Sequence, residues 1–217
     1  MTQVFGYQTT EGIVLATDSL ALFYDDGRVR RDTVRKVIHL SPEVVLVAAG
    51  AGYGLALAQA FEQHVRQNRL WKAGDILARS LPFCRAHEES IRNRVGGPSA
   101  EHEELDRYYL LLAATRIGSS PPEVNLMLLG SEEPGDPVHP IPVGPALAIP
   151  RNMGYEVRMA RLPEDQQTLE HAEEIMKGFL SRLAEKSEDV APPFIFIRVD
   201  SDGIREHTLE QPSSESG

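Results

Sequence analysis

Four positions in the first fifty residues have the chemistry of a nucleophilic site. A threonine hydroxyl is a poor nucleophile and needs a base beside it. If Met1 is removed, Thr2 carries its own base, a free α-amino group with a reference pKa of about 8. A cation close to this hydroxyl would favour its ionised form, and a carboxylate would hold that cation in place. Lys36 and Asp18 are the candidates for these two roles. Backbone N–H groups at the glycine turn around Gly50 would bind an oxyanion.

These residues fall at the ends of expected strands, which a rigid sheet can bring close together. Alternating and β-branched runs predict strands, and apolar residues three or four apart predict helices. Residues 3–8 and 13–17 are expected to form one hairpin, and residues 36–40 and 44–50 another. Residues 23–28, FYDDGR, have the composition of a turn. The further expected strands are 107–115, 124–130, 194–200 and 203–209, and the expected helices are 53–68, 75–94, 151–162 and 168–186.

The order of these elements predicts the fold class. Strands come in antiparallel hairpins and helices in blocks, which argues against an alternating βαβ sheet. The continuous apolar strands require burial on both faces, so two stacked antiparallel sheets with helix pairs on their outer faces are expected. We expect one domain over residues 1–209, followed by a disordered tail at residues 210–217, EQPSSESG.

Composition excludes several function classes. The chain has 217 residues, of which 41% are hydrophobic and 25% charged, as in a soluble globular protein. A net charge of −10 argues against nucleic acid or an anionic membrane as the main partner. The single cysteine, Cys84, excludes an internal disulfide, and no apolar run has the length of a membrane span. With no secretory signal at the first residues, a cytoplasmic location is expected.

Each candidate residue also has a plainer interpretation. A threonine at position 2 is commonly an accident, Asp18 alone would be a turn residue, Lys36 a solvated strand end, and Gly50 a helix start. His87, His102 and His171 lack zinc-motif spacing, and Cys84 is expected to pack in a helix. No metal or organic cofactor is implied.

The first 65 residues or so resemble a β-type subunit of the proteasome family, including its simpler bacterial relatives. Thr2, Gly12, Asp18 and Ser19 match the family pattern of a first threonine, a turn glycine and an apolar strand that ends in Asp-Ser. Lys36 matches a lysine that opens the next long strand, and residues 49–52, AGAG, match a small-residue turn before a helix.

This resemblance implies a four-layer αββα sandwich, membership of the N-terminal nucleophile hydrolases, and stacking into rings. It implies a threonine-type peptide hydrolase in a self-compartmentalising ring, with Thr2, Asp18, Lys36, Gly50 and Ser19 as site residues. Asp189 matches the aspartate of a later Asp-x-x-Ser-Gly pattern, although Pro192 stands in place of its serine. The family's Gly-Ser-Gly-Ser turn is also replaced, here by residues 149–156, IPRNMGYE.

The resemblance also places a pocket for the residue before the cut at Val34, Ile38 and Ala48, which predicts apolar specificity. The implied partners are a peptide or unfolded-protein substrate, further copies of this chain in a ring of about six or more, and an unfoldase. The expected helix 168–186 has a wide apolar surface between positions 175 and 183, which favours an interface between copies. The alternative is a catalytically inactive structural or peptide-binding ring subunit.

Overall fold

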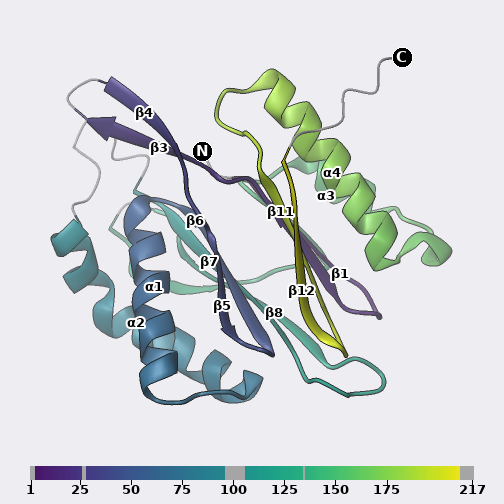
Figure 1. Cartoon of the computed structure of the whole chain (residues 1–217), viewed down its shortest axis with the longest axis horizontal. Coiled ribbons are helices and arrows are strands. Elements are labelled where there is room, and N and C mark those ends of the chain that lie inside the picture. The colour runs from purple at the N-terminus through teal and green to yellow at the C-terminus, as the bar shows by residue number, and fades with distance from the viewer. Residues whose placement is uncertain (1–2, 26–27, 96–105, 134, 211–217) are drawn as a thin grey trace. The chain divides into compact units, whose positions relative to one another are not determined.

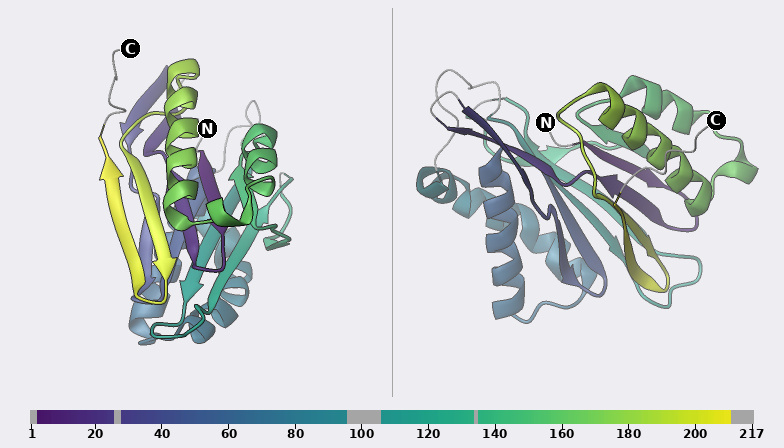
Figure 2. Two further views of the ribbon diagram at one scale, coloured as in Figure 1. Left: turned by 90° about the vertical axis from the view of Figure 1, so that its right-hand side faces the viewer. Right: turned by 45° about the horizontal axis from the view of Figure 1, so that its top comes forward.

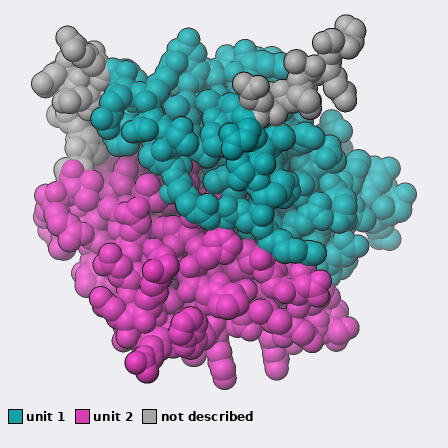
Figure 3. Space-filling view, viewed as in Figure 1, with its two compact units in different colours: residues 1–35, 145–198, 205–217 teal, residues 36–144, 199–204 magenta. Residues whose placement is uncertain are grey.

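The computed structural model describes residues 3–25, 28–95, 106–133 and 135–210 (Figure 1). Its contacts divide the chain into two compact units that alternate along the sequence (Figure 3). Unit 1 contains residues 1–35, 145–198 and 205–217, and unit 2 contains residues 36–144 and 199–204. The expected disordered tail lies outside the described residues, apart from Glu210.

Unit 1 is built on a five-stranded sheet in the order β10-β1-β2-β11-β12. The predicted hairpin at its centre is confirmed, because β1 and β2 pair antiparallel from Val4 opposite Thr17 to Gln8 opposite Ile13. The short strand β10, which the sequence did not predict, pairs with the other edge of β1. The strands are β1 (Val4–Gln8), β2 (Ile13–Thr17), β10 (Ala146–Ile149), β11 (Phe194–Asp200) and β12 (Gly203–Leu209).

Two helices cover one face of this sheet (Figure 2). They are α3 (Met153–Ala160) and α4 (Leu169–Lys186), which follows the short 3₁₀ helix η2 (Glu164–Gln166). Asn152 and Thr168 cap them, because each side-chain oxygen accepts a backbone N–H three residues later. Aromatic and aliphatic residues of β1, β2 and β11 pack with both helices in one core.

A two-stranded ribbon completes unit 1. It consists of β3 (Leu20–Asp25) and β4 (Arg28–Thr33), paired from Leu20 opposite Thr33 to Asp25 opposite Arg28. The composition of residues 23–28 predicts only a turn here. The arginine-rich β4 lacks the apolar alternation that marks a half-buried strand.

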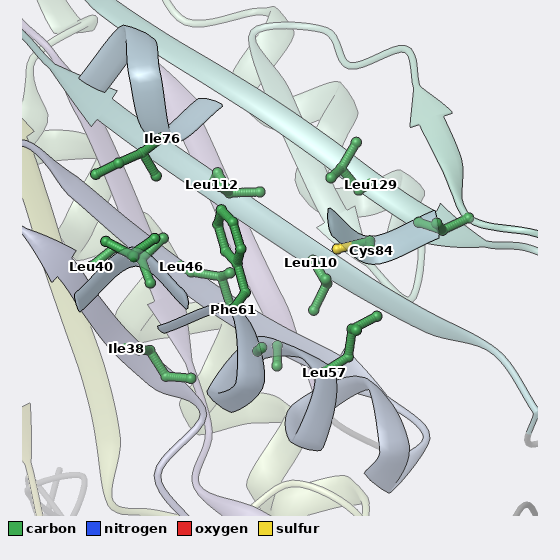
Figure 4. Packing of buried hydrophobic residues seen from close by; sticks show 14 of the residues in the cluster. Ile38, Leu40, Leu46, Leu57, Phe61, Ile76, Cys84, Leu110, Leu112 and Leu129 are labelled. Atoms are coloured by element: carbon green, nitrogen blue, oxygen red, sulfur yellow. The ribbon is translucent and has the colours of Figure 1, made fainter. Parts of the chain in front are cut away.

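Unit 2 pairs a second five-stranded sheet, in the order β5-β6-β7-β8-β9, with two helices. The predicted helices are confirmed as α1 (Gly52–Gln67) and α2 (Ala73–Val95), which contains Pro82. Their buried faces pack on alternate sheet residues such as Leu46 and Leu110 (Figure 4). The strands are β5 (Val37–Ser41), β6 (Val44–Gly50), β7 (Tyr108–Thr115), β8 (Val124–Ser131) and β9 (His139–Ile141).

The expectation of a four-layer αββα sandwich is wrong. The described residues form twelve strands in three sheets, of five, two and five strands, together with four α-helices. The sequence order predicted two of these sheets, but not the separate β3–β4 ribbon. The hydrophobic pattern of a strand indicates how deeply the strand is buried, but it does not indicate with which sheet the strand pairs.

Candidate active site

The carboxylate of Asp18 is the best-defined polar group at the expected site. Asp18 directly follows β2 and its side chain is fully buried. One carboxylate oxygen, Oδ1, accepts the backbone N–H of Gln3 at 2.9 Å, and Oδ2 accepts that of Leu20 at 3.1 Å. Such charge-assisted bonds are stronger than neutral ones, so Asp18 ties the start of β1 to the end of β2.

Gln3, the residue immediately after Thr2, is fixed on its other side as well. Its side-chain amide donates to the carbonyls of Ile149 and Pro150, each at 3.3 Å, at the end of β10. Gln3 is 5% exposed. The chain is therefore held between β2 and β10 at the position that adjoins the expected nucleophile. Thr2 itself lies outside the described residues.

Ser19 connects this turn to the segment that precedes β11. Its hydroxyl is buried and donates to the Pro193 carbonyl at 2.8 Å. Its own carbonyl accepts the backbone N–H of Val34 at 2.8 Å. Ser19 thus joins three segments of unit 1 that are far apart in sequence.

A hollow of about 770 Å³ lies in unit 1 between the ribbon and the segment that leads to β11. Its apolar lining comes from Leu22 and Val29, and its charged lining from Arg30, Arg31, Glu188 and Asp189. Arg31 forms an ion pair with Glu188 across it. Asp189, a predicted catalytic residue, is exposed here, and its backbone N–H donates to the Ser187 hydroxyl at 3.2 Å.

The other predicted site residues belong to unit 2. Lys36 immediately precedes β5 and is 3% exposed, unusually low for a lysine. Its carbonyl accepts the Ala48 backbone N–H at 3.0 Å. Ile38 and Ala48, predicted to line a substrate pocket, are buried in the core beneath α1 and α2.

Gly50 occupies a position that only glycine fits. Its φ is +89°, and a Cβ there would lie 2.2 Å from the Arg107 carbonyl oxygen. That carbonyl accepts the Ala51 N–H at 2.7 Å, which leads the chain into α1. The first turn of α1 contains no acidic residue and no side-chain cap, so its N–H groups retain their positive potential.

The structure therefore brings Asp18 and Ser19 together with Gln3, and it places Lys36 and Gly50 in unit 2. That the two groups meet around Thr2 stays a prediction. The apolar pocket of Val34, Ile38 and Ala48 also stays a prediction; Val34 is half-buried in unit 1.

A partly buried charged cluster around Arg92 of α2 is not predicted from the sequence. Arg92 donates to the Tyr53 hydroxyl at 2.8 Å, and its guanidinium lies 3.6 Å from Asp106 and 3.8 Å from Glu88. Tyr53 packs edge-on against Tyr108, 4.9 Å between ring centroids, directly behind Gly50. The i, i+4 spacing of Glu88 and Arg92 was a usable signal, but it is more typical of an exposed helix face.

Comparison with solved structures shows that related folds exist, and Anbu is one of them. No protein-family model and no curated protein sequence matches the chain. A Gly-1 mutant of Anbu from Hyphomicrobium sp. strain MC1 superposes with a TM-score of 0.68, covering 100% of this chain and 89% of that chain. The two sequences are 14% identical, so the similarity establishes related folds and not shared chemistry.

This finding corrects the assignment made from the sequence. The structure resembles that of Anbu at 14% identity, and no family model places the chain in the proteasome β-type subunit family. The placement of the chain in that family is therefore wrong. Among the described residues, no helix is both long enough and apolar enough to cross a membrane.

Proposed function

We propose that the chain is a hydrolase of peptide bonds that uses Thr2 as its nucleophile after loss of Met1. The observation that carries the proposal is the fully buried Asp18 carboxylate, which binds the backbone of Gln3, the residue next to Thr2. A nucleophile must be held in a fixed place, and Asp18 fixes the chain beside it. The fold shared with Anbu is compatible with this class of activity.

In the proposed reaction the free amine of Thr2 removes the proton from its own hydroxyl, and the hydroxyl oxygen attacks the substrate carbonyl carbon. The ammonium then returns that proton to the leaving amine as the C–N bond breaks, which leaves an ester on Thr2. Water hydrolyses this ester with the amine again acting as base. Lys36 would stabilise the ionised hydroxyl, and backbone N–H groups at Gly50 would stabilise the oxyanion.

The hollow beside the ribbon is the proposed location for part of the substrate. Its apolar lining of Leu22 and Val29 suits extended peptide side chains, and its charged lining offers hydrogen bonds to a backbone. Val34, which is half-buried in unit 1, would favour an apolar residue before the cut, by about 1–3 kcal/mol for a missing contact, whereas Ile38 and Ala48 are buried in the core of unit 2.

The test begins with the intact mass of the purified protein, which must lack Met1. A panel of short fluorogenic peptides then compares the wild type with Thr2→Ala and Thr2→Ser. We expect Thr2→Ala to abolish hydrolysis while Thr2→Ser, which retains a hydroxyl and an amine, keeps part of it. Undiminished hydrolysis by Thr2→Ala, or a mass that includes Met1, would overturn the proposal.

A second candidate function is a ring subunit that binds peptides without cleaving them. The observation that favours it is the Ser19–Pro193 contact, because the Ser19 hydroxyl donates to a backbone carbonyl at 2.8 Å and serves a structural role next to Asp18. Peptide binding by the wild type, undiminished in Thr2→Ala and without any cleavage, would establish this alternative.

A further inference from the structure

Unit 1 contains a second hollow, of about 180 Å³, between α3 and α4. Except for Arg158 on α3, the residues that line it form one stripe along α4, with spacings of three or four residues. The lining residues are Arg158, His171, Glu174, Ile175, Gly178 and Arg182. None of them belongs to the proposed catalytic site.

The two arginines differ from most others in this acidic chain. Arg31, Arg116, Arg151 and Arg198 each pair with a glutamate. In the described part of the chain, neither Arg158 nor Arg182 has such a partner. Glu174, the carboxylate in the lining, instead lies 4.0 Å from Lys177. The groove therefore concentrates positive charge on a molecule whose net charge is −10.

Packing holds the Arg182 guanidinium in position. It lies 4.6 Å from the centroid of the Phe179 ring, a cation–π distance. The Phe179 ring is itself packed edge-on against Tyr155, with 5.5 Å between centroids. A guanidinium that is oriented in advance loses less side-chain entropy when it binds a ligand.

Gly178 leaves the centre of the groove open. A Cβ built on Gly178 would lie 3.5 Å from Arg182 Nη1, so any larger side chain would occupy the space in front of the guanidinium. The volume is several times the roughly 30 Å³ that one water occupies in the liquid. A small oxyanion with part of its hydration shell fits this space.

We propose that this groove binds an oxyanion, a phosphate or carboxylate group, between Arg158 and Arg182. Guanidinium groups present paired N–H donors that match both kinds of oxyanion. The backbone at Gly178 allows close approach, and His171, which also lines the groove, has a ring N–H that can donate a hydrogen bond. This site is independent of the proposed hydrolase activity.

The test measures binding of inorganic phosphate and of acetate to the full chain by titration calorimetry, at constant ionic strength in chloride. We expect saturable binding of at least one ion, and the stronger ion identifies the source of the oxyanion. Arg158→Gln and Arg182→Gln should each weaken that binding about tenfold or more, because each removes a charged donor. Arg161→Gln, an exposed arginine of the same region outside the groove, is the matched control and should leave affinity unchanged.

Gly178→Leu gives a second test that keeps both charges and fills the groove. It should abolish binding while circular dichroism shows the native fold. The proposal is overturned if neither ion binds, if the two arginine variants bind as tightly as the wild type, or if Arg161→Gln weakens binding equally. Undiminished binding by a folded Gly178→Leu variant also overturns it.

Discussion

At the scale of single residues, Asp18 has the clearest structural role. Asp18→Asn keeps the shape but replaces one carboxylate oxygen by an N–H₂ group, which cannot accept a backbone N–H. We expect the free energy of unfolding to fall by about 1–3 kcal/mol, the cost of one buried donor left unsatisfied. Urea denaturation measures this. Asp165→Asn, at an exposed aspartate of η2, is the control, and equal midpoints for both variants would contradict the assigned role.

Gly50 allows a backbone conformation to be separated from a steric clash. Gly50→Ala combines φ = +89° with a Cβ 2.2 Å from the Arg107 carbonyl oxygen. Gly118→Ala has a similar φ, +78°, with no atom within 4 Å of its Cβ. We expect Gly118→Ala to cost about 1–2 kcal/mol from conformation alone, and Gly50→Ala to cost more because the strand must also move.

Denaturant unfolding measures the loss of stability in Gly50→Ala and Gly118→Ala. Equal losses would show that the close approach of the Arg107 carbonyl oxygen adds no cost at position 50. Gly52→Ala, at the start of α1 with open space around its Cβ, completes the series. It should be neutral or slightly stabilising, because alanine favours helix.

Cys84 provides a test of burial by chemical reactivity. Burial, and to a smaller extent the charge of Glu88, raises the pKa of its thiol to about 12. Only the thiolate reacts with alkylating reagents, so at about pH 8.5, near the reference pKa of a free cysteine, the folded protein should label far more slowly than the urea-unfolded chain. Because Cys84 is the single cysteine, mass spectrometry counts the reaction directly.

The same shift has a consequence for stability. The unfolded thiol ionises at a lower pH than the folded one, so this contribution is fully present below about pH 9 and is lost between there and about pH 12. Labelling of the native protein at the rate of the unfolded chain would contradict the buried position of Cys84.

At the scale of elements, the hydrophobic periodicity of the sequence predicted the helices and two of the hairpins. The helices α1, α2, α3 and α4 and the hairpins β1–β2 and β5–β6 were predicted within a few residues of their bounds. The ribbon β3–β4 was missed because its residues do not alternate between a core and solvent; Val29 is 55% exposed and Phe23 41%. Its Asp-Gly pair is nevertheless a strong hairpin signal.

The partly buried charged cluster around Arg92 joins α2 to α1 and to the segment before β7. Arg92 is the cation that faces Glu88, Asp106 and the Tyr53 hydroxyl. Arg92→Met keeps the length of the side chain and removes the cation that two partly buried carboxylates face, so we expect a loss of about 1–3 kcal/mol. Arg94→Met, in the same turn but exposed, should change stability by no more than about 0.5 kcal/mol. A loss for Arg92→Met no larger than for Arg94→Met would show that the cluster is not a structural support.

At the scale of the whole molecule, the sequence predicted some of the buried polar residues, but it did not predict which distant residues they contact. Asp18 and Ser19 were identified from their position after a buried strand, and the structure confirms that both are buried and bonded. Their hydrogen-bond partners, Gln3 and Pro193, were not predicted. Each partner contributes a backbone group, an N–H in Gln3 and a carbonyl in Pro193, and such groups leave no signal in the sequence. The sequence also could not show that Ile38 and Ala48 lie in a helix-covered core.

The exposed apolar side chains of the described residues bear on whether the protein assembles into an oligomer. The apolar face of α4, which suggested an interface, is largely used within unit 1, where Ile175, Met176 and Leu180 are buried. Exposed apolar side chains instead lie at Met153 on α3 and at Phe23 and Val29 on the ribbon. Apolar side chains left in water favour association, and closed cyclic symmetry is its commonest form. A peptide hydrolase of this kind would also require its site to be enclosed.

We therefore expect a closed homo-oligomer of about six or more chains. Light scattering coupled to size exclusion at physiological salt should give a mass several times that of the 24.0 kDa chain. Thr2→Ala should give the same mass, because removing one hydroxyl changes the proposed chemistry and none of the exposed apolar surface. A stable monomer that hydrolyses peptides would contradict the oligomer and leave the proposed role of Thr2 intact. A closed oligomer without peptide hydrolysis would contradict the role of Thr2 and leave the oligomer intact.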